Sequence, residues 1–213
     1  MDIYASDDEK AEALKSWWRE NGRSVVTGIV LGGAIIFGWR YWLTHQQSAT
    51  EQAATIYQQV QMKLTEDDLT QAEDLTQTLM QSHAKTPYAA FAALELAAKQ
   101  VRAKQPEAAL EYLNWAAEKA QLDAQKDLAR LRAVRVLTDQ EDYEQALQIA
   151  QQPALAAYAS LFDELQGDIY LAQGQKSEAF AAYRNALSSL NENDPRRTIL
   201  EMKRDDVAVI DEG

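Results

Sequence analysis

An alanine recurs at a nearly constant interval along most of this chain of 213 residues. Ala72, Ala109, Ala146 and Ala179 each follow a polar turn and open a stretch in which apolar residues recur every three or four positions. Their separations are 37, 37 and 33 residues. Such an interval predicts stacked copies of a helical unit, because one unit of this size cannot bury its apolar face alone. No segment alternates between apolar and polar residues as a strand does, so we predict an all-α fold.

The last unit shows the pattern most clearly. Six small or aromatic residues have the relative spacing that is typical of a tetratricopeptide repeat: Gly167, Tyr170, Gly174, Ala179, Tyr183 and Ala186. In such a repeat, Gly167 and Ala179 allow two antiparallel helices to touch, Gly174 ends the first helix, and the tyrosines fill the space between repeats. Residues 44–213 are therefore predicted to form a tetratricopeptide-like solenoid of helical hairpins. The alternative is an unrelated helical bundle with an accidental periodicity.

A strongly apolar run without charges precedes the repeats. Residues 24–39 read SVVTGIVLGGAIIFGW, and with residues 40–43 they form about 30 Å of helix, the thickness of a bilayer's hydrocarbon core. Aromatic residues flank the run on both sides, as in membrane-spanning helices: Trp17, Trp18, Trp39, Tyr41 and Trp42. A cleaved signal peptide would need a short basic leader and a small-residue cleavage site, and a buried core helix would need a polar face. We therefore predict a tail at 1–23 and a single transmembrane signal anchor at 24–43.

The basic residues near the two ends of this run predict its orientation. Lys10, Lys15, Arg19 and Arg23 precede the run, whereas Arg40 is the only basic residue in 40–59. The end richer in Lys and Arg stays in the cytoplasm, so residues 44–213 are expected across the membrane, in the periplasm if the cell is Gram-negative. The chain has no cysteine, which suits an oxidising compartment.

Two glycines inside the apolar run are separated by four positions. Gly28 and Gly32 therefore lie on one face of the expected helix, where the lack of side chains allows another backbone to approach closely. This spacing predicts a packing face for a partner membrane helix. The alternative is that the two residues reflect the general abundance of glycine in membrane helices.

The composition excludes several classes of function. The chain has 33 acidic and 21 basic residues and a formal net charge of −12, whereas sites for nucleic-acid phosphates need clustered Lys and Arg. The absence of cysteine excludes Cys-ligated zinc and iron–sulfur clusters, and the only histidines are His45 and His83. No nucleotide-binding or hydrolase motif occurs. We therefore predict no nucleic-acid partner, no metal, no cofactor and no enzymatic activity.

Three arginines that are close in sequence are candidate contacts for a partner. Arg130, Arg132 and Arg135 are suited to binding an acidic peptide, because a guanidinium forms charge-assisted hydrogen bonds with carboxylates. Alternatively, these arginines balance neighbouring acidic residues, which are Asp127, Asp139 and Glu141.

The order of a short tail, one anchor and degenerate repeats resembles the YfgM family, the ancillary SecYEG translocon subunits of Gram-negative inner membranes. The similar segments are Met1–Tyr4, Arg19–Gly22, Gly38–Trp42, Ala93–Ala97 and the last repeat. The resemblance implies association with the SecYEG translocon and with the periplasmic chaperone PpiD, and assistance to newly exported polypeptides as they fold. It implies no catalytic residues. The alternative is a tetratricopeptide scaffold for another envelope assembly, such as division or wall synthesis.

Overall fold

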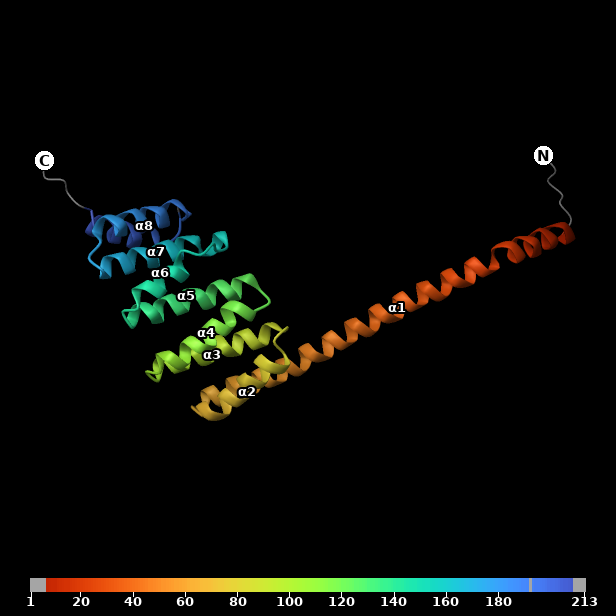
Figure 1. The fold of residues 1–213 in the computed structure, drawn as a ribbon, viewed down its shortest axis with the longest axis horizontal. Coiled ribbons are helices and arrows are strands. Elements are labelled where there is room, and N and C mark those ends of the chain that lie inside the picture. The colour runs from red at the N-terminus through yellow and green to blue at the C-terminus, as the bar shows by residue number, and fades with distance from the viewer. Residues whose placement is uncertain (1–6, 192, 209–213) are drawn as a thin grey trace. The chain divides into compact units, whose positions relative to one another are not determined.

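The chain forms helices throughout the part that its computed structural model describes, residues 7–191 and 193–208. The helices are α1 (Asp7–Thr65), α2 (Leu69–Ser82), α3 (Pro87–Arg102), α4 (Pro106–Lys119), α5 (Asp123–Asp139), α6 (Tyr143–Ala150), α7 (Ala156–Ala172), α8 (Lys176–Ser188) and α9 (Arg197–Asp206) (Figure 1). No strand occurs in these ranges, and the predicted all-α fold is confirmed. The Met1–Tyr4 motif and residues 209–213 of the acidic end lie outside the described residues.

Internal contacts divide the chain into two units, residues 1–49 and 50–213. In the second unit, the last turns of α1 and the helices α2 to α8 form four consecutive helical pairs, and Figure 1 shows α2 to α8 stacked in chain order. From α2 onward each helix contacts the next, and α3 also contacts α5, as α5 contacts α7. The end of α1 shares a core cluster with α2 and α3. The first helices of successive pairs therefore lie side by side in one layer. This is the helical-hairpin solenoid that the alanine spacing predicts.

The recurring alanines lie in the second helix of each pair. Ala72, Ala109, Ala146 and Ala179 are all completely buried. A small side chain at this position allows the two helices of a hairpin to approach closely, and larger neighbours fill the space around it. Tyr112 and Trp115 of α4, for example, pack against two successive core clusters. The repeat in the sequence is therefore a repeat in the core.

The turn inside each hairpin also repeats. Asp67, Lys104, Glu141 and Gly174 all have positive φ angles, of 56°, 59°, 62° and 75°. Their separations are again 37, 37 and 33 residues, and each lies five positions before one of the recurring alanines. Only the last turn has glycine, the residue that adopts this left-handed conformation without steric cost. The sequence pattern showed Gly174 but gave no sign of its three non-glycine equivalents.

The ends of several helices carry the expected signals. Pro87 and Pro106 occupy the first turns of α3 and α4, where the missing N–H would have no helical partner. The side chains of Asp68 and Asp142 cap α2 and α6 by accepting hydrogen bonds from the backbone N–H groups of Gln71 and Gln145, both at 3.2 Å.

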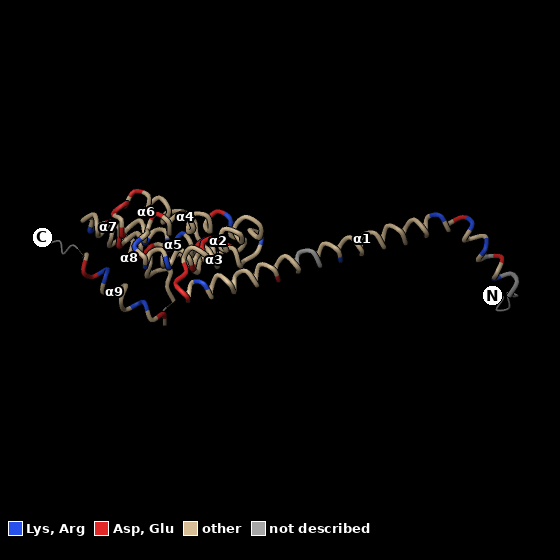
Figure 2. Tube along the Cα trace, turned by 90° about the horizontal axis from the view of Figure 1, so that it is seen from below, with Lys and Arg blue, Asp and Glu red and all other residues tan. Residues whose placement is uncertain are grey.

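The first unit consists of the N-terminal part of α1. Its large apolar residues are exposed, including Ile35 and Phe37 at 72% and 77%. Figure 2 shows charged residues at the start of α1 followed by a long stretch without them. By length and composition, α1 is the one helix among the described residues that is apolar enough to cross a membrane. The predicted segment 24–43 lies within this helix, and the predicted boundaries at 23 and 43 coincide with no break in it.

Candidate interaction groove

The six predicted packing residues of the last repeat lie in the hairpin of α7 and α8. A Cβ atom at Gly167 would overlap the ring of Tyr183, so only glycine fits the present geometry. Tyr183 is completely buried, as are Ala179 and Ala186. Tyr170 is partly buried beside them, and its hydroxyl accepts a hydrogen bond from Gln151 Nε2 at 3.3 Å. Gly174 follows the end of α7 in the left-handed conformation.

A polar cluster joins this hairpin to α9. The Tyr183 hydroxyl donates a hydrogen bond to Asp168 Oδ1 at 2.7 Å. Burial raises the pKa of Tyr183, and Asp168 raises it further. Lys203 of α9 donates to Asp168 and to Glu164, at 2.8 and 2.9 Å to the nearest oxygens. Leu200 of α9 is also buried in the core cluster of this hairpin, so the polar cluster and Leu200 together attach α9 to the last repeat. The polar cluster therefore has a structural role.

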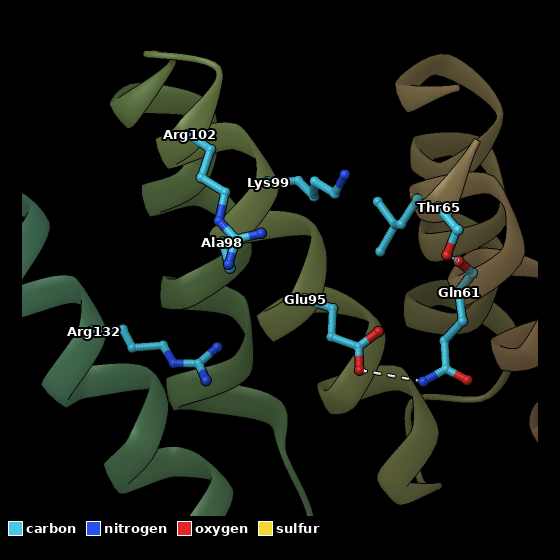
Figure 3. A pocket seen from close by; sticks show the side chains of 8 residues that line it. Gln61, Thr65, Glu95, Ala98, Lys99, Arg102 and Arg132 are labelled. Carbon is cyan, nitrogen blue, oxygen red and sulfur yellow. Dashed lines mark hydrogen bonds between the residues drawn. The ribbon is translucent and has the colours of Figure 1, made fainter. Parts of the chain in front are cut away.

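A hollow lies in the layer of first helices, between the end of α1, α3 and α5 (Figure 3). Its volume is about 380 Å³. Most of its lining is polar or charged: Gln61, Thr65, Glu95, Lys99, Arg102 and Arg132. A second hollow of about 290 Å³ adjoins it and shares Ala98, Arg102 and Arg132. The second hollow adds four apolar residues and two charged ones to the lining: Ala97, Val101, Leu113, Val136, Arg135 and Asp139. We call the two hollows together the α3/α5 groove.

Glu95, the acidic residue of the first hollow, is held from the α1 side. The Tyr57 hydroxyl donates to Glu95 Oε1 at 2.5 Å, and Gln61 Nε2 donates to the same oxygen at 3.4 Å, as Figure 3 shows for Gln61. Burial and the hydrogen bond to Glu95 raise the pKa of Tyr57. Lys99 is also engaged, because its Nζ lies 2.6 Å from Asp67 Oδ1 at the turn after α1. The Lys99 hydrogen bond lowers the pKa of the Asp67 carboxyl.

The three predicted arginines are not brought together. Arg132 and Arg135 lie three positions apart on α5 and line the groove. Arg130 lies on another face of α5, where it donates to the carbonyl oxygens of Pro153 and Gln152 at 2.9 and 3.3 Å. It also lies 3.5 Å from Asp127 and stacks over Phe162. Arg130 is therefore used within the fold.

Arg102 of α3 replaces Arg130 as the third groove arginine, and the sequence analysis missed it. The repeat interval could have indicated which residues of α3 and α5 line the same groove. Each groove residue of α5 lies 37 positions after a groove residue of α3: Arg132 after Glu95, Arg135 after Ala98, Val136 after Lys99 and Asp139 after Arg102. Arg102 thus lies 30 and 33 positions before Arg132 and Arg135, the arginines that line the groove with it, whereas Arg130, only two positions before Arg132, points to a different face.

The groove arginines have few partners of their own. Arg132 donates one hydrogen bond, to the Leu94 carbonyl oxygen at 3.0 Å. Burial lowers the pKa of Arg132, and the nearby charge of Arg135 adds to this effect. Within residues 7–191 and 193–208, Arg102 and Arg135 form no hydrogen bond or ion pair through their side chains, and Arg132 forms no ion pair. The chemistry available here is recognition of an anionic group.

The predicted helix-packing residues of the first unit have a different setting. A Cβ atom at Gly28 or Gly32 would meet no described atom within 4 Å, apart from the local helix backbone. Both positions therefore present uncovered backbone on one side of an exposed apolar helix.

Comparison with known proteins places this arrangement of an apolar helix and helical pairs in a family. Residues 15–209 match the family model described as a tetratricopeptide repeat-like domain. A protein of Haemophilus influenzae named "Ancillary SecYEG translocon subunit" is 30% identical over 189 residues, which are 89% of this chain and 92% of that protein. The chain belongs to this family. The resemblance to YfgM proteins inferred from the sequence is thereby confirmed.

Two further relatives bear the same name. The protein of Escherichia coli strain K12 is 28% identical, and the alignment covers 89% of this chain and 91% of the relative. The protein of Neisseria gonorrhoeae is 26% identical, with 96% of this chain and 99% of the relative covered. The similarity therefore includes the apolar helix as well as the repeats. No solved structure matches the chain significantly.

Proposed function

We propose that this protein is a membrane-anchored, non-enzymatic scaffold of the Sec translocon. The observation that carries the proposal is the alignment of relatives named ancillary SecYEG translocon subunits over about nine-tenths of the chain. Because the alignment is nearly full-length, the anchor and the repeats are both shared with those relatives. The proposed role is to hold the repeats next to the export channel, where they receive exported polypeptides and contact a chaperone such as PpiD.

The proposed topology has residues 1–23 in the cytoplasm, an anchor at 24–43 and the repeats in the periplasm. Four basic residues before the apolar run and one after it support this orientation. Protease added to spheroplasts is expected to digest the repeats and to leave a fragment containing the tail. Repeats that stay intact until the cells are lysed would contradict the orientation.

The proposed contact with the translocon uses the glycine face of the anchor. Gly28 and Gly32 expose backbone on one side of α1, and small residues at this spacing allow close helix packing in a bilayer. Val30 lies about 200° around the helix from Gly28 and provides a matched position on the opposite face. The anchor would thus dock laterally against a membrane helix of SecYEG.

A photo-crosslinking residue placed at 28 or at 30 in the full-length chain tests this function. In intact membranes, position 28 is expected to capture a SecYEG subunit, and position 30 to capture much less of it. A crosslinker at position 135, on the repeats, is expected to capture exported polypeptides or a periplasmic chaperone. Capture of division or wall-synthesis proteins from these positions, with no Sec component, would contradict the proposal.

A further inference from the structure

The α3/α5 groove contrasts in charge with the rest of the repeats. Of the chain's net charge of −12, the repeats carry most, since acidic residues greatly outnumber basic ones after the anchor. The groove nevertheless gathers Arg102, Arg132 and Arg135, together with Lys99, around one hollow surface, which the acidic residues Glu95 and Asp139 also line. An excess of one charge sign on a concave surface focuses the local potential and attracts ions of the opposite sign.

The groove arginines also differ from most other basic residues of the repeats in that they form no ion pairs. In the described part of the repeats, nine of the thirteen other basic residues form ion pairs: Lys63, Lys99, Lys119, Lys126, Arg130, Arg196, Arg197, Lys203 and Arg204. Carboxylates are therefore abundant and within reach of most basic groups. The three groove arginines have none, although each guanidinium has five N–H donors. Their free donors point to a ligand that supplies the carboxylates.

The groove also has an apolar part. Val101, Val136 and Ala97 line the second hollow, next to Arg102 and Arg135. Val101 is 40% exposed at the end of α3. A lipid headgroup or a small anion would pair with the guanidinium groups and leave this surface uncovered. A peptide segment that carries acidic residues beside apolar ones would cover both parts.

We propose that the α3/α5 groove binds acidic, amphipathic segments of partner proteins. Carboxylates of the segment pair with Arg102, Arg132 and Arg135, and its apolar side chains cover Val101, the exposed apolar side chain of the second hollow. Figure 3 shows Arg132 extending from α5 toward α3 and Arg102 lying over the same hollow. The inference rests on the proposed scaffold function and adds to it the surface and the chemistry of recognition.

The test measures peptide binding to the full-length chain in lipid nanodiscs by fluorescence anisotropy. The probe is a short labelled peptide of Leu, Ala and Glu, and its counterpart has Lys in place of every Glu. The acidic peptide is expected to bind more tightly than the basic one. Its affinity should fall as salt rises from physiological ionic strength toward 1 M, because the screening length shrinks from about 8 to about 3 Å. Equal binding of the two peptides would overturn the proposal.

A pair of charge reversals locates the site. Arg102→Glu with Arg135→Glu is expected to weaken binding of the acidic peptide about tenfold or more, since two exposed attractions become repulsions. Both side chains are exposed, so the fold should be retained, which circular dichroism checks. The control is Lys176→Glu with Arg184→Glu on α8, which changes the net charge equally at exposed positions without a described ion pair. Equal loss in the control pair would overturn the assignment to the groove.

Two further measurements separate this inference from the scaffold function and from lipid binding. If the wild-type chain captures SecYEG from membranes but does not bind the acidic peptide, the groove proposal is wrong and the scaffold function stands. Vesicles of phosphatidylglycerol, added as competitor, are expected to displace little peptide. If they displace it fully and bind through the same arginines, the groove is a lipid site and the proposal is overturned.

Discussion

Glycine has opposite surroundings in the two units of this protein. In the repeats, Gly167 lies so close to Tyr183 that even one added carbon atom would overlap the ring. In the apolar part of α1, Gly28 and Gly32 would accept a Cβ atom without meeting a described neighbour within 4 Å. The same residue type thus marks a contact completed inside the chain in one unit and an uncovered surface in the other.

This difference indicates that the small residues of the repeats pack within the chain, whereas those of the apolar helix are available to another helix. The repeats bury their small residues against their own larger ones, so substitutions there change the stability of the fold. An apolar helix that buries little of itself gains no such stability from its glycines. We therefore expect substitutions on its glycine face to change association with another helix and to leave the repeats intact.

The largest effect is expected for Gly167→Leu. The new side chain must displace Tyr183, which is completely buried and hydrogen-bonded to Asp168. Overpacking of this kind should lower the free energy of unfolding by about 3 kcal/mol. Chemical denaturation of the full-length chain in detergent, followed by circular dichroism, measures the change. A variant that unfolds at the same denaturant concentration as the wild type would show that α7 and α8 separate easily.

A smaller loss is expected for Ala179→Leu, at the same hairpin. Ala179 is completely buried, but the helix can shift slightly to accept a longer side chain. The free energy of unfolding should fall by about 2 kcal/mol. Gln175→Leu is the control, because Gln175 is exposed one turn before Ala179. Thermal unfolding of both variants should show a lower midpoint for Ala179→Leu alone, and equal midpoints would contradict the assigned register.

In the apolar part of α1, Gly28→Leu combined with Gly32→Leu should leave the free energy of unfolding of the repeats unchanged. Recovery of SecYEG with this variant is expected to fall about tenfold, corresponding to a loss of about 1.4 kcal/mol of helix association. Val30→Leu on the opposite face is the control and should retain recovery. Undiminished recovery with the double variant would mean that the repeats alone hold the translocon.

The smallest effect is a gain at the third hairpin turn. Glu141 has a φ angle of 62°, whereas the equivalent residue of the last repeat is Gly174. Glu141→Gly should therefore raise the free energy of unfolding by about 0.5–1 kcal/mol, through relief of backbone strain. Gln148→Gly, in the following helix, should instead lower it by a similar amount. Denaturation curves distinguish the two signs, and a loss for Glu141→Gly would show that its side chain stabilises the turn.

Much of the architecture was predictable because its determinants are local or strictly periodic. Apolar residues at helical spacing indicate a helix wherever they occur, and Ala72 to Ala179 recur because each hairpin needs a small residue at the same crossing. The apolar run at 24–39 is equally direct, since its length and its flanking aromatic residues need no tertiary context.

The candidate site was only partly predictable. Arg132 and Arg135 were expected to act together, and both line the groove. Arg130 was grouped with them because it is close in sequence, but a separation of two positions on a helix places side chains on nearly opposite faces. It donates instead to the carbonyl oxygens of Gln152 and Pro153. Arg102 was missed because its nearness to Arg132 depends on the stacking of α3 beside α5.

The sequence alone therefore determined the helices, the repeat interval, the apolar N-terminal helix and the family, because each of these depends on residues at short or constant separations. The tertiary structure decided which charges meet. The ion pair between Lys203 and Asp168, for example, joins residues that are tens of positions apart in the sequence. Whether a residue such as Arg102 has an ion-pair partner likewise depends on how the helices pack. Side-chain charges have no fixed period in the sequence, so their partners are set only when the helices pack against one another.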